Sequence, residues 1–209
     1  MQLTIIADTH GDHEALGSMS GEVLIHCGDV LNLFNEPWND LVLERIDAWF
    51  GRQEFDLILC IGGNHDVELQ RLSASGHKPF ENAHYLEGEE YTFEGVKFFG
   101  APWVPHLQGH AFFVEDDSLA EKWEHIPGDV DVLITHTPPY GIMDTSSAGL
   151  VLGCPHLSRK LAQLNPGVHC FGHVHKGSGV EKRDNTTFIN AALVNRDYKI
   201  CRRPFIVEI

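Results

Sequence analysis

Five short apolar runs of this chain each end in polar side chains of the kind that bind metal ions, often beside a glycine. The runs are IIADTHG, LIHCGDV, LCIGGNHD, VLITHTPP and FGHVHKG, and they end in Asp8, His10, Asp29, Asn64, His65, Asp66, His136, His173 and His175. Ligands of open α/β sheets bind outside the carboxyl ends of the strands. If these runs are neighbouring strands, their ends form one cluster of imidazoles, carboxylates and an amide.

Unpaired polar groups are costly to bury, so the cluster predicts bound divalent cations. Along an extended chain, residues two apart share one face and lie roughly 6.5 to 7 Å apart, so the pairs Asp8 with His10 and His173 with His175 can serve one ion or two neighbours. Two-metal hydrolytic sites hold their ions about 3.5 to 4 Å apart. Asp29 stands alone at the end of its run, which suits a carboxylate that bridges both ions.

The charge balance narrows the class of partner. The chain has 15 basic and 30 acidic residues and a net charge of −15. A protein that binds duplex nucleic acid needs a basic face, so this balance argues against that class. An anionic substrate would need local positive charge, which bound metals can supply. Mixed nitrogen and oxygen ligands suit Mn²⁺, Fe, Zn²⁺, Ni²⁺ or Co²⁺ better than Mg²⁺ or Ca²⁺.

The remaining pattern predicts a mixed α/β layered domain over residues 1–209, without a linker. Strands are expected at 2–7, 22–27, 55–61, 90–93, 96–101, 131–136 and 167–173, and the tail segments 186–194 and 203–209 are expected to be antiparallel strands. Helices are expected at 38–51, from about Asp66 with that side chain as the cap, at 117–126 and at 156–164.

Nothing in the sequence predicts a membrane segment or a secretory leader. The longest apolar runs are strand-sized, and MQLTIIADTH has neither a basic start nor a long apolar stretch. The five cysteines form no CxxC pair, which indicates a reducing compartment. We therefore expect a cytoplasmic protein with no membrane partner.

The ordered set DTH, GD, GNHD, TH and GHVH resembles the signature of the calcineurin-like metallophosphoesterases. The segments FFGAPWVP, WEHIP, DVLITHTPPYGIMD, GCPHL and FINAALVN resemble one branch, the metallophosphoesterase-domain-containing (MPPED) or class III cyclic-nucleotide phosphodiesterase proteins. This resemblance covers essentially the whole chain. It implies a four-layer αββα sandwich of two mixed β-sheets flanked by helices, in a single metallophosphoesterase domain at residues 1–209.

The resemblance also implies a dinuclear metal centre, with Mn²⁺ or Fe as the first expectation. One ion would be held by Asp8, His10, His175 and the shared Asp29. The other would be held by Asp29, Asn64, His136 and His173. A hydroxide between the ions would attack phosphorus, and His65, which is not a ligand, would contact the phosphoryl oxygen or protonate the leaving group. The expected substrate is a small phosphoester or nucleotide, such as a cyclic nucleotide.

Two departures from the branch bear on the substrate. The run VLNLF follows GD at residues 30–34, where a smaller and more polar run is expected, and Lys176 follows the last histidine where an acidic residue is expected. Lys176 could contact a phosphate or face solvent. The alternatives within the superfamily are a phosphomonoesterase or phosphoprotein phosphatase, a dinucleoside polyphosphate hydrolase and a nuclease subunit. Outside it, the alternative is a non-catalytic scaffold, which the intact set of motif residues disfavours.

Other polar residues are not expected to be ligands. His26 and His169 lie within strands and are expected to be hydrogen-bonded there. His110 and Trp103 could line the substrate pocket or pack within loops. Asp12 and Asp66 could orient site residues or serve as caps, and Asp144 could be a supporting or a purely structural residue.

Overall fold

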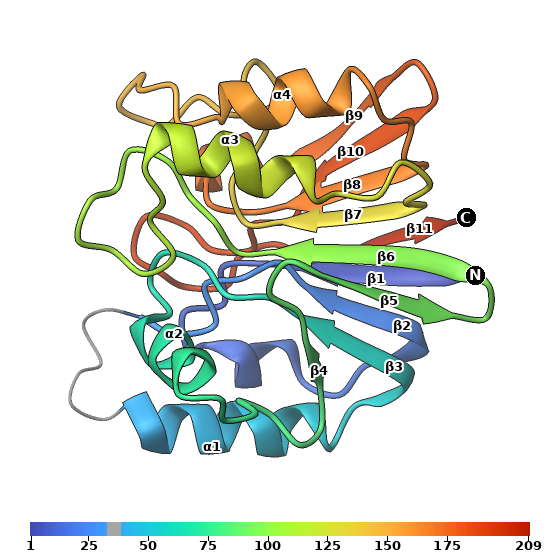
Figure 1. The fold of residues 1–209 in the computed structure, drawn as a ribbon. Coiled ribbons are helices and arrows are strands. Elements are labelled where there is room, and N and C mark those ends of the chain that lie inside the picture. The colour runs from blue at the N-terminus through green and yellow to red at the C-terminus, as the bar shows by residue number, and fades with distance from the viewer. Residues whose placement is uncertain (33–38) are drawn as a thin grey trace.

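The computed structural model describes residues 1–32 and 39–209, and two mixed β-sheets form its centre (Figure 1). The first sheet contains β1 (Gln2–Ile6), β2 (Ser20–His26), β3 (Glu54–Cys60), β4 (His84–Tyr85) and β11 (Phe205–Glu208), in the order β11-β1-β2-β3-β4. β1 to β4 run parallel, and β11 pairs antiparallel with β1 at the edge.

The second sheet has the order β5-β6-β7-β8-β10-β9. Its strands are β5 (Glu89–Phe93), β6 (Val96–Ala101), β7 (Val132–Thr135), β8 (Val168–Phe171), β9 (Gly179–Arg183) and β10 (Thr186–Asn190). The four central strands, β6, β7, β8 and β10, run parallel, and the edge strands β5 and β9 are antiparallel to their neighbours. Each sheet therefore has a parallel centre, whose strand ends can build one site.

Helices cover the outer face of each sheet, which confirms the predicted four-layer αββα sandwich (Figure 1). α1 (Asn39–Phe50) and α2 (Val67–Ala74) lie outside the first sheet, and α3 (Asp116–Glu124) and α4 (Pro155–Leu161) lie outside the second. Trp49 and Phe50 of α1 pack with Ile6 and Leu24 of the first sheet. Trp123 of α3 belongs to the cluster that covers the second sheet.

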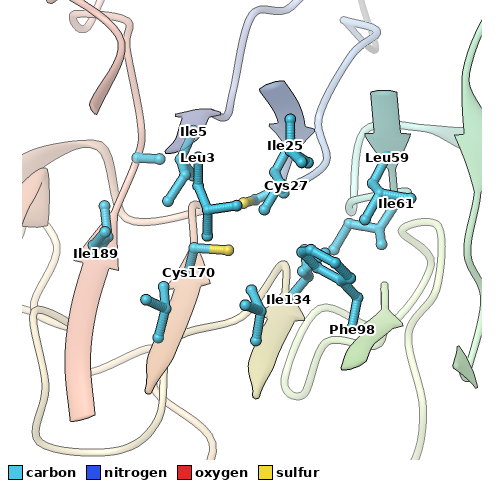
Figure 2. Packing of buried hydrophobic residues seen from close by; sticks show 14 of the residues in the cluster. Leu3, Ile5, Ile25, Cys27, Leu59, Ile61, Phe98, Ile134, Cys170 and Ile189 are labelled. Atoms are coloured by element: carbon cyan, nitrogen blue, oxygen red, sulfur yellow. The ribbon is translucent and has the colours of Figure 1, made fainter. Parts of the chain in front are cut away.

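The two sheets pack face to face through alternate residues of their strands (Figure 2). Leu3 and Ile5 of β1 and Ile25 of β2 face Ile134 and Cys170 of the second sheet, and all five are buried. The period of two in a strand places the intervening residues on the helix side. Burying one such aliphatic side chain contributes about 1.5 to 3 kcal/mol, so this layer is a major source of the stability of the sandwich.

The structure confirms the predicted strands and helices to within a few residues, with two corrections. Asp66 precedes α2, but its side chain makes no capping hydrogen bond. The tail strands also do not pair with each other: β11 is antiparallel to β1, whereas β10 is antiparallel to β9 and parallel to β8. The sequence analysis missed β9 and the short β4. The first residue of the predicted helix 38–51, and residues 33–34 of the VLNLF run, lie outside the described residues.

Among the described residues, no helix is long and apolar enough to cross a bilayer.

Candidate metal centre

The candidate site lies at the carboxyl ends of parallel strands from both sheets. β1 leads to Asp8 and His10, β2 to Asp29, and β3 to Asn64 and His65. From the second sheet, His136 follows β7 directly, and His173 and His175 follow β8. Because the two sheets are stacked, these loops meet at one end of the sandwich, as the sequence analysis expected.

Four of these residues have a left-handed backbone, which is uncommon for side chains other than glycine. The φ angles are 55° at Asp8, 46° at His10, 56° at Asp29 and 69° at His173. Asp and His tolerate this region better than most residues, yet each instance costs of order 1 kcal/mol. The strand ends thus turn sharply where the polar side chains converge, and the surrounding fold holds this strain.

One group of side chains gathers around Asp8. The Nε2 atoms of His10 and His175 are 3.3 Å apart, and His175 Nε2 lies 3.4 Å from Asp8 Oδ1. The His173 backbone N–H donates to both oxygens of Asp8, at 3.1 and 3.0 Å, and so fixes that carboxylate. Asp8, His10 and His175 each offer one ligand atom within the spacing that a single metal ion requires.

A second group gathers around the side-chain oxygen of Asn64. This Oδ1 atom lies 3.0 Å from His136 Nε2 and 2.7 Å from His173 Nδ1. His136 Nε2 also lies 3.4 Å from Asp29 Oδ2. The three side chains come from loops after β3, β7 and β8, which are far apart in the sequence.

Asp29 lies between the two groups. Its Oδ2 atom is 3.4 Å from His136 Nε2 on one side and 3.9 Å from His10 Nε2 on the other. The same atom lies 4.0 Å from His65 Nε2, and Oδ1 accepts a hydrogen bond from the His65 backbone N–H at 2.8 Å. The carboxylate therefore lies within 4.0 Å of a histidine of each group, which is the position a bridging ligand would need.

The hydrogen bonds of two histidines test whether the cluster suits a cation. His10 Nδ1 lies 3.0 Å from the Leu31 carbonyl and His136 Nδ1 lies 2.9 Å from the Cys27 carbonyl, so both Nδ1 atoms donate. In the neutral rings Nε2 then carries a lone pair, which points at the acceptor atoms of Asn64, Asp8 or Asp29. Such convergent acceptors fit a metal ion, and histidine ligands held by backbone carbonyls are usual around metals.

Burial and the local charges also indicate that the cluster suits a metal ion. Burial lowers the pKa of His10 to about 4 and that of His173 to about 3, so both rings are neutral at pH 7, the form that binds metals. Burial is the largest influence on His136 and lowers its pKa, but the charge and hydrogen bond of Asp29, the charge of Asp8 and the Cys27 carbonyl together outweigh it and raise this pKa to about 9. The buried carboxylates thus draw positive charge into the cluster, which divalent cations would provide.

Two glycines leave room for the packed polar atoms. A Cβ on Gly28, whose φ is 89°, would lie against the Gly62 carbonyl oxygen and 2.7 Å from His136 Nδ1. A Cβ on Gly63 would meet Asp29 Oδ1 and would lie 2.7 Å from His136 Cε1. Any side chain at either position would displace Asp29 or His136, which explains the glycines of the GD and GNHD motifs.

Asp66 does not cap α2; its side chain holds two loops of the site together. Its carboxylate accepts hydrogen bonds from the backbone N–H groups of Leu31 at 2.7 Å, Gly63 at 2.8 Å and Val30 at 3.3 Å. Burial, with the charge of Asp29, raises the pKa of Asp66 to about 8. Asp66 therefore ties the loop that carries Asp29 to the loop that carries Asn64.

Tyr198 is a site residue that the sequence analysis missed. Its ring centroid lies 4.6 Å from that of His10, 5.7 Å from His175 and 5.8 Å from His65. The loop that carries it is anchored by Asp12, whose carboxylate accepts from the Ile200 backbone N–H at 3.1 Å and from Lys199 Nζ at 3.3 Å. Tyrosine is not among the metal-binding residue types by which the sequence analysis searched, and only the tertiary fold brings Tyr198 to the centre.

The remaining polar residues take supporting or separate places. His26 Nε2 pairs with Thr9 Oγ1 at 2.9 Å, beneath the Asp8 and His10 turn. His110 Nδ1 lies 3.5 Å from Asn64 Nδ2 at the border of the site, whereas Trp103 packs against Trp123 in the outer core. Asp144 is structural: its carboxylate accepts from the Gly141 backbone N–H at 2.7 Å.

His169 is the strand histidine that the sequence analysis expected, and its burial predicts an acid-sensitive fold. Thr135 Oγ1 donates to the Thr137 carbonyl at 2.7 Å, so His169 Nε2 must donate to Thr135 Oγ1 at 2.9 Å. His169 Nδ1 has no hydrogen-bond partner among the described residues. Burial lowers the pKa of His169 to about 3, whereas the unfolded chain takes up this proton near pH 6.5.

We expect this histidine to reduce stability by about 1.4 kcal/mol per pH unit as the pH falls below 6.5, because acid protonates only the unfolded form. Urea unfolding of the native chain and of His169→Phe, both in EDTA between pH 7 and 4.5, measures the effect. The variant should show the shallower pH slope. The control His125→Phe, at an exposed ring, should keep the native slope. Equal slopes for the native chain and His169→Phe would contradict the prediction.

The family of the chain is settled by comparison with known proteins. Residues 1–177 match the calcineurin-like phosphoesterase family, and the chain belongs to it. This membership confirms the resemblance seen in the motifs and places the chain in the class of metal-dependent phosphoester hydrolases. The paired His and Asp clusters are consistent with the dinuclear metal sites typical of that family.

Curated relatives match along all or nearly all of the chain. The chain is 34% identical to a UPF0046 protein of Caenorhabditis elegans, over 100% of this chain and 75% of the relative. It is 30% identical to human metallophosphoesterase domain-containing protein 1, over 98% of this chain and 69% of the relative. A crystal structure with 16% identity matches with a TM-score of 0.67, over 90% of this chain and 89% of the other, which supports the fold alone.

Proposed function

We propose that the chain is a phosphodiesterase that acts on small phosphoesters such as cyclic nucleotides, with two metal ions and with His65 as the general acid. The observation that carries this proposal is the position of Asp29, whose Oδ2 atom lies within 4.0 Å of His10, His65 and His136 at once. One ion would be held by Asp8, His10, His175 and Asp29, and the other by Asp29, Asn64, His136 and His173.

These residues would hold the ions through lone pairs that other contacts already orient. The carbonyls of Leu31 and Cys27 fix the rings of His10 and His136, and the His173 backbone N–H fixes Asp8. When bound, the two ions supply Lewis acidity toward the phosphoryl oxygens and an activated water as the nucleophile. Manganese or iron suits this mixed nitrogen and oxygen set, and Zn²⁺, Ni²⁺ and Co²⁺ are the alternatives.

His65 is proposed to act on the leaving group because it lies at the rim of the cluster. Its side chain is 12% exposed, whereas those of His10 and His136 are fully buried. Its backbone N–H is held by Asp29, and its ring packs against His10 with centroids 4.7 Å apart. This position leaves the imidazole close to bound substrate, where it can donate a proton to the departing oxygen.

The charge at the centre favours a diester over a monoester. Two divalent cations bring four positive charges, of which Asp8, Asp29 and a bound hydroxide would neutralise three, leaving about one. A diester carries one negative charge, which matches the remaining positive charge of about one, whereas a monoester dianion carries two. A phosphomonoesterase, a phosphoprotein phosphatase or a dinucleoside polyphosphate hydrolase remains the alternative function within the family.

Hydrolysis of two chromogenic esters tests the proposal. The protein reconstituted with Mn²⁺ is expected to hydrolyse bis-p-nitrophenyl phosphate with a kcat/KM at least about tenfold above that for p-nitrophenyl phosphate, since the centre matches the diester charge. EDTA should abolish the activity and Mn²⁺ should restore it. A lack of activity with every divalent metal would overturn the enzymatic proposal, and a preference for the monoester would overturn the choice of a diesterase.

We also propose that residues 1–209 act as one domain and that the protein works in the cytoplasm. Core packing between the two sheets draws on strands from β1 to β10, which supports one folding unit. The five cysteines are free thiols, and four of them are buried, which suits a reducing compartment.

A further inference from the structure

A cavity of about 480 Å³ adjoins the candidate metal centre through His173 and His175. Its wall includes three basic side chains, Lys176, Arg196 and Arg202, and none of the described residues that line it is acidic. The chain as a whole has 30 acidic residues against 15 basic ones. The wall of this cavity is therefore basic in a protein that is acidic overall.

Two of these cations have no internal role that would explain them. The side chains of Lys176 and Arg196 make no hydrogen bond or ion pair with any described residue. Other basic side chains of the chain are paired, for example Lys160 with Glu124 at 2.9 Å and Arg52 with Glu14 at 2.6 Å. Arg202 is anchored differently, because its Nη1 donates to the Val194 carbonyl at 2.5 Å, which holds the guanidinium at the wall of the cavity.

The loop that carries Arg196 is held in place. Asn195 Oδ1 accepts from the backbone N–H groups of Asp197 at 2.9 Å and Lys199 at 3.1 Å. Asp12 fixes the far end of the loop at Ile200. The same loop therefore presents Arg196 to the cavity and Tyr198 to the histidines of the centre.

We propose that this cavity binds a second phosphate of the substrate, on Lys176, Arg196 and Arg202, while the scissile phosphoester lies at the metal centre. The proposal rests on the proposed function and narrows it to phosphoesters that carry a further phosphate. The cavity volume falls in the range of small-ligand sites and fits a ligand the size of a mononucleotide. Arg binds phosphate through paired N–H donors, and Lys binds it as a point charge.

The proposed subsite explains why a lysine stands at position 176. The residue follows His175 directly, so its backbone is fixed to the candidate metal centre, and its side chain lines the cavity. An acidic side chain at this position would repel the second phosphate. The sequence analysis expected an acidic residue at this position, and the lysine that stands there makes the wall basic without altering the residues of the centre.

A binding comparison tests the subsite without turnover. Isothermal titration of the Mn²⁺-loaded protein is expected to show adenosine 3′,5′-bisphosphate binding about tenfold or more tightly than adenosine 3′-monophosphate, because the second phosphate gains charge-assisted hydrogen bonds. The double variant Lys176→Gln with Arg196→Gln should bind the two ligands within about threefold of each other, by loss of affinity for the bisphosphate alone. The control Lys182→Gln with Arg203→Gln removes the same charge outside the cavity and should keep the native preference.

The subsite is overturned if the native protein binds both ligands equally, if it does not bind the bisphosphate, or if the preference survives in the double variant. A kinetic arm compares 2′,3′-cyclic AMP with its 5′-phosphorylated form and should show the higher kcat/KM for the latter. Hydrolysis of bis-p-nitrophenyl phosphate without a bisphosphate preference would defeat the subsite and leave the proposed function standing. A bisphosphate preference without hydrolysis of any ester would defeat the proposed function and leave the subsite standing.

Discussion

Replacement of Asp29 by alanine is expected to remove both metal ions and to lower kcat/KM for bis-p-nitrophenyl phosphate by about a thousandfold or more. Asp29 Oδ2 lies 3.4 Å from His136 Nε2 and 3.9 Å from His10 Nε2, so the two ligand groups share this oxygen. Its Oδ1 atom also holds the His65 backbone. Metal content by mass spectrometry and steady-state hydrolysis measure the two effects.

Comparison with a neighbouring carboxylate makes this test specific. Asp8 is fully buried, its Oδ1 lies 3.4 Å from His175 Nε2, and in the proposed arrangement it binds only the ion that His10 and His175 hold. Asp8→Ala should therefore lose one ion and retain part of the second, whereas Asp29→Ala should lose both. Asp56→Ala, on β3 and away from the cluster, should bind metal as the native chain does. Two retained ions in Asp29→Ala, with the fold intact by circular dichroism, would contradict the bridging role.

The strand ends could be predicted because two local signals coincide in the sequence. Apolar runs such as LIHCGDV have the length and composition of buried strands, and the polar residues come directly after them. In the structure β2 ends at His26 and Asp29 follows within three residues. Parallel pairing then brings such ends together without any further information, which is why the cluster could be expected from the sequence.

Spacing alone could not assign roles to three consecutive polar residues. Asn64 directs its oxygen to His136 and His173, His65 lies at the rim beside Asp29, and Asp66 accepts backbone hydrogen bonds from Leu31. Asp66 has the sequence position of a helix cap, and that local preference predicted the wrong contact. The backbone N–H groups of a neighbouring loop compete for the carboxylate, and they belong to a segment more than 30 residues away.

The sequence analysis also did not predict the wall of the cavity beside the candidate metal centre. Arg196 and Tyr198 lie in a loop after β10, and Arg202 follows a few residues later. Arginine and tyrosine are not residue types that mark a metal site, and this segment reaches the centre because β10 pairs with β8 in the second sheet. Local patterns thus predicted the cluster of polar side chains, whereas the residues that we propose to select the substrate are placed by the sheet order.

Loss of the His65 imidazole is expected to leave both metal ions in place and to slow the release of poor leaving groups. His65 lies at the rim of the cluster, 4.0 Å from Asp29 Oδ2, and is proposed as an acid and not as a ligand. A general acid contributes about 10² to 10⁴ in rate when the departing oxygen is basic. His65→Ala should therefore lower kcat for 2′,3′-cyclic AMP by about a hundredfold or more, and far less for bis-p-nitrophenyl phosphate, whose leaving group departs without protonation.

The dependence on the leaving group separates proton donation from a structural role of the ring, because a displaced centre would slow both substrates alike. His110→Ala is the matched control: its ring lies 6.3 Å from that of His65 at the border of the site, and its loss should slow both substrates equally or not at all. His65 also reaches His10 and Asp29 closely enough to hold an ion with them. Loss of an ion from His65→Ala, or an equal defect on the two esters, would make His65 a ligand and leave the leaving group to be protonated by another donor.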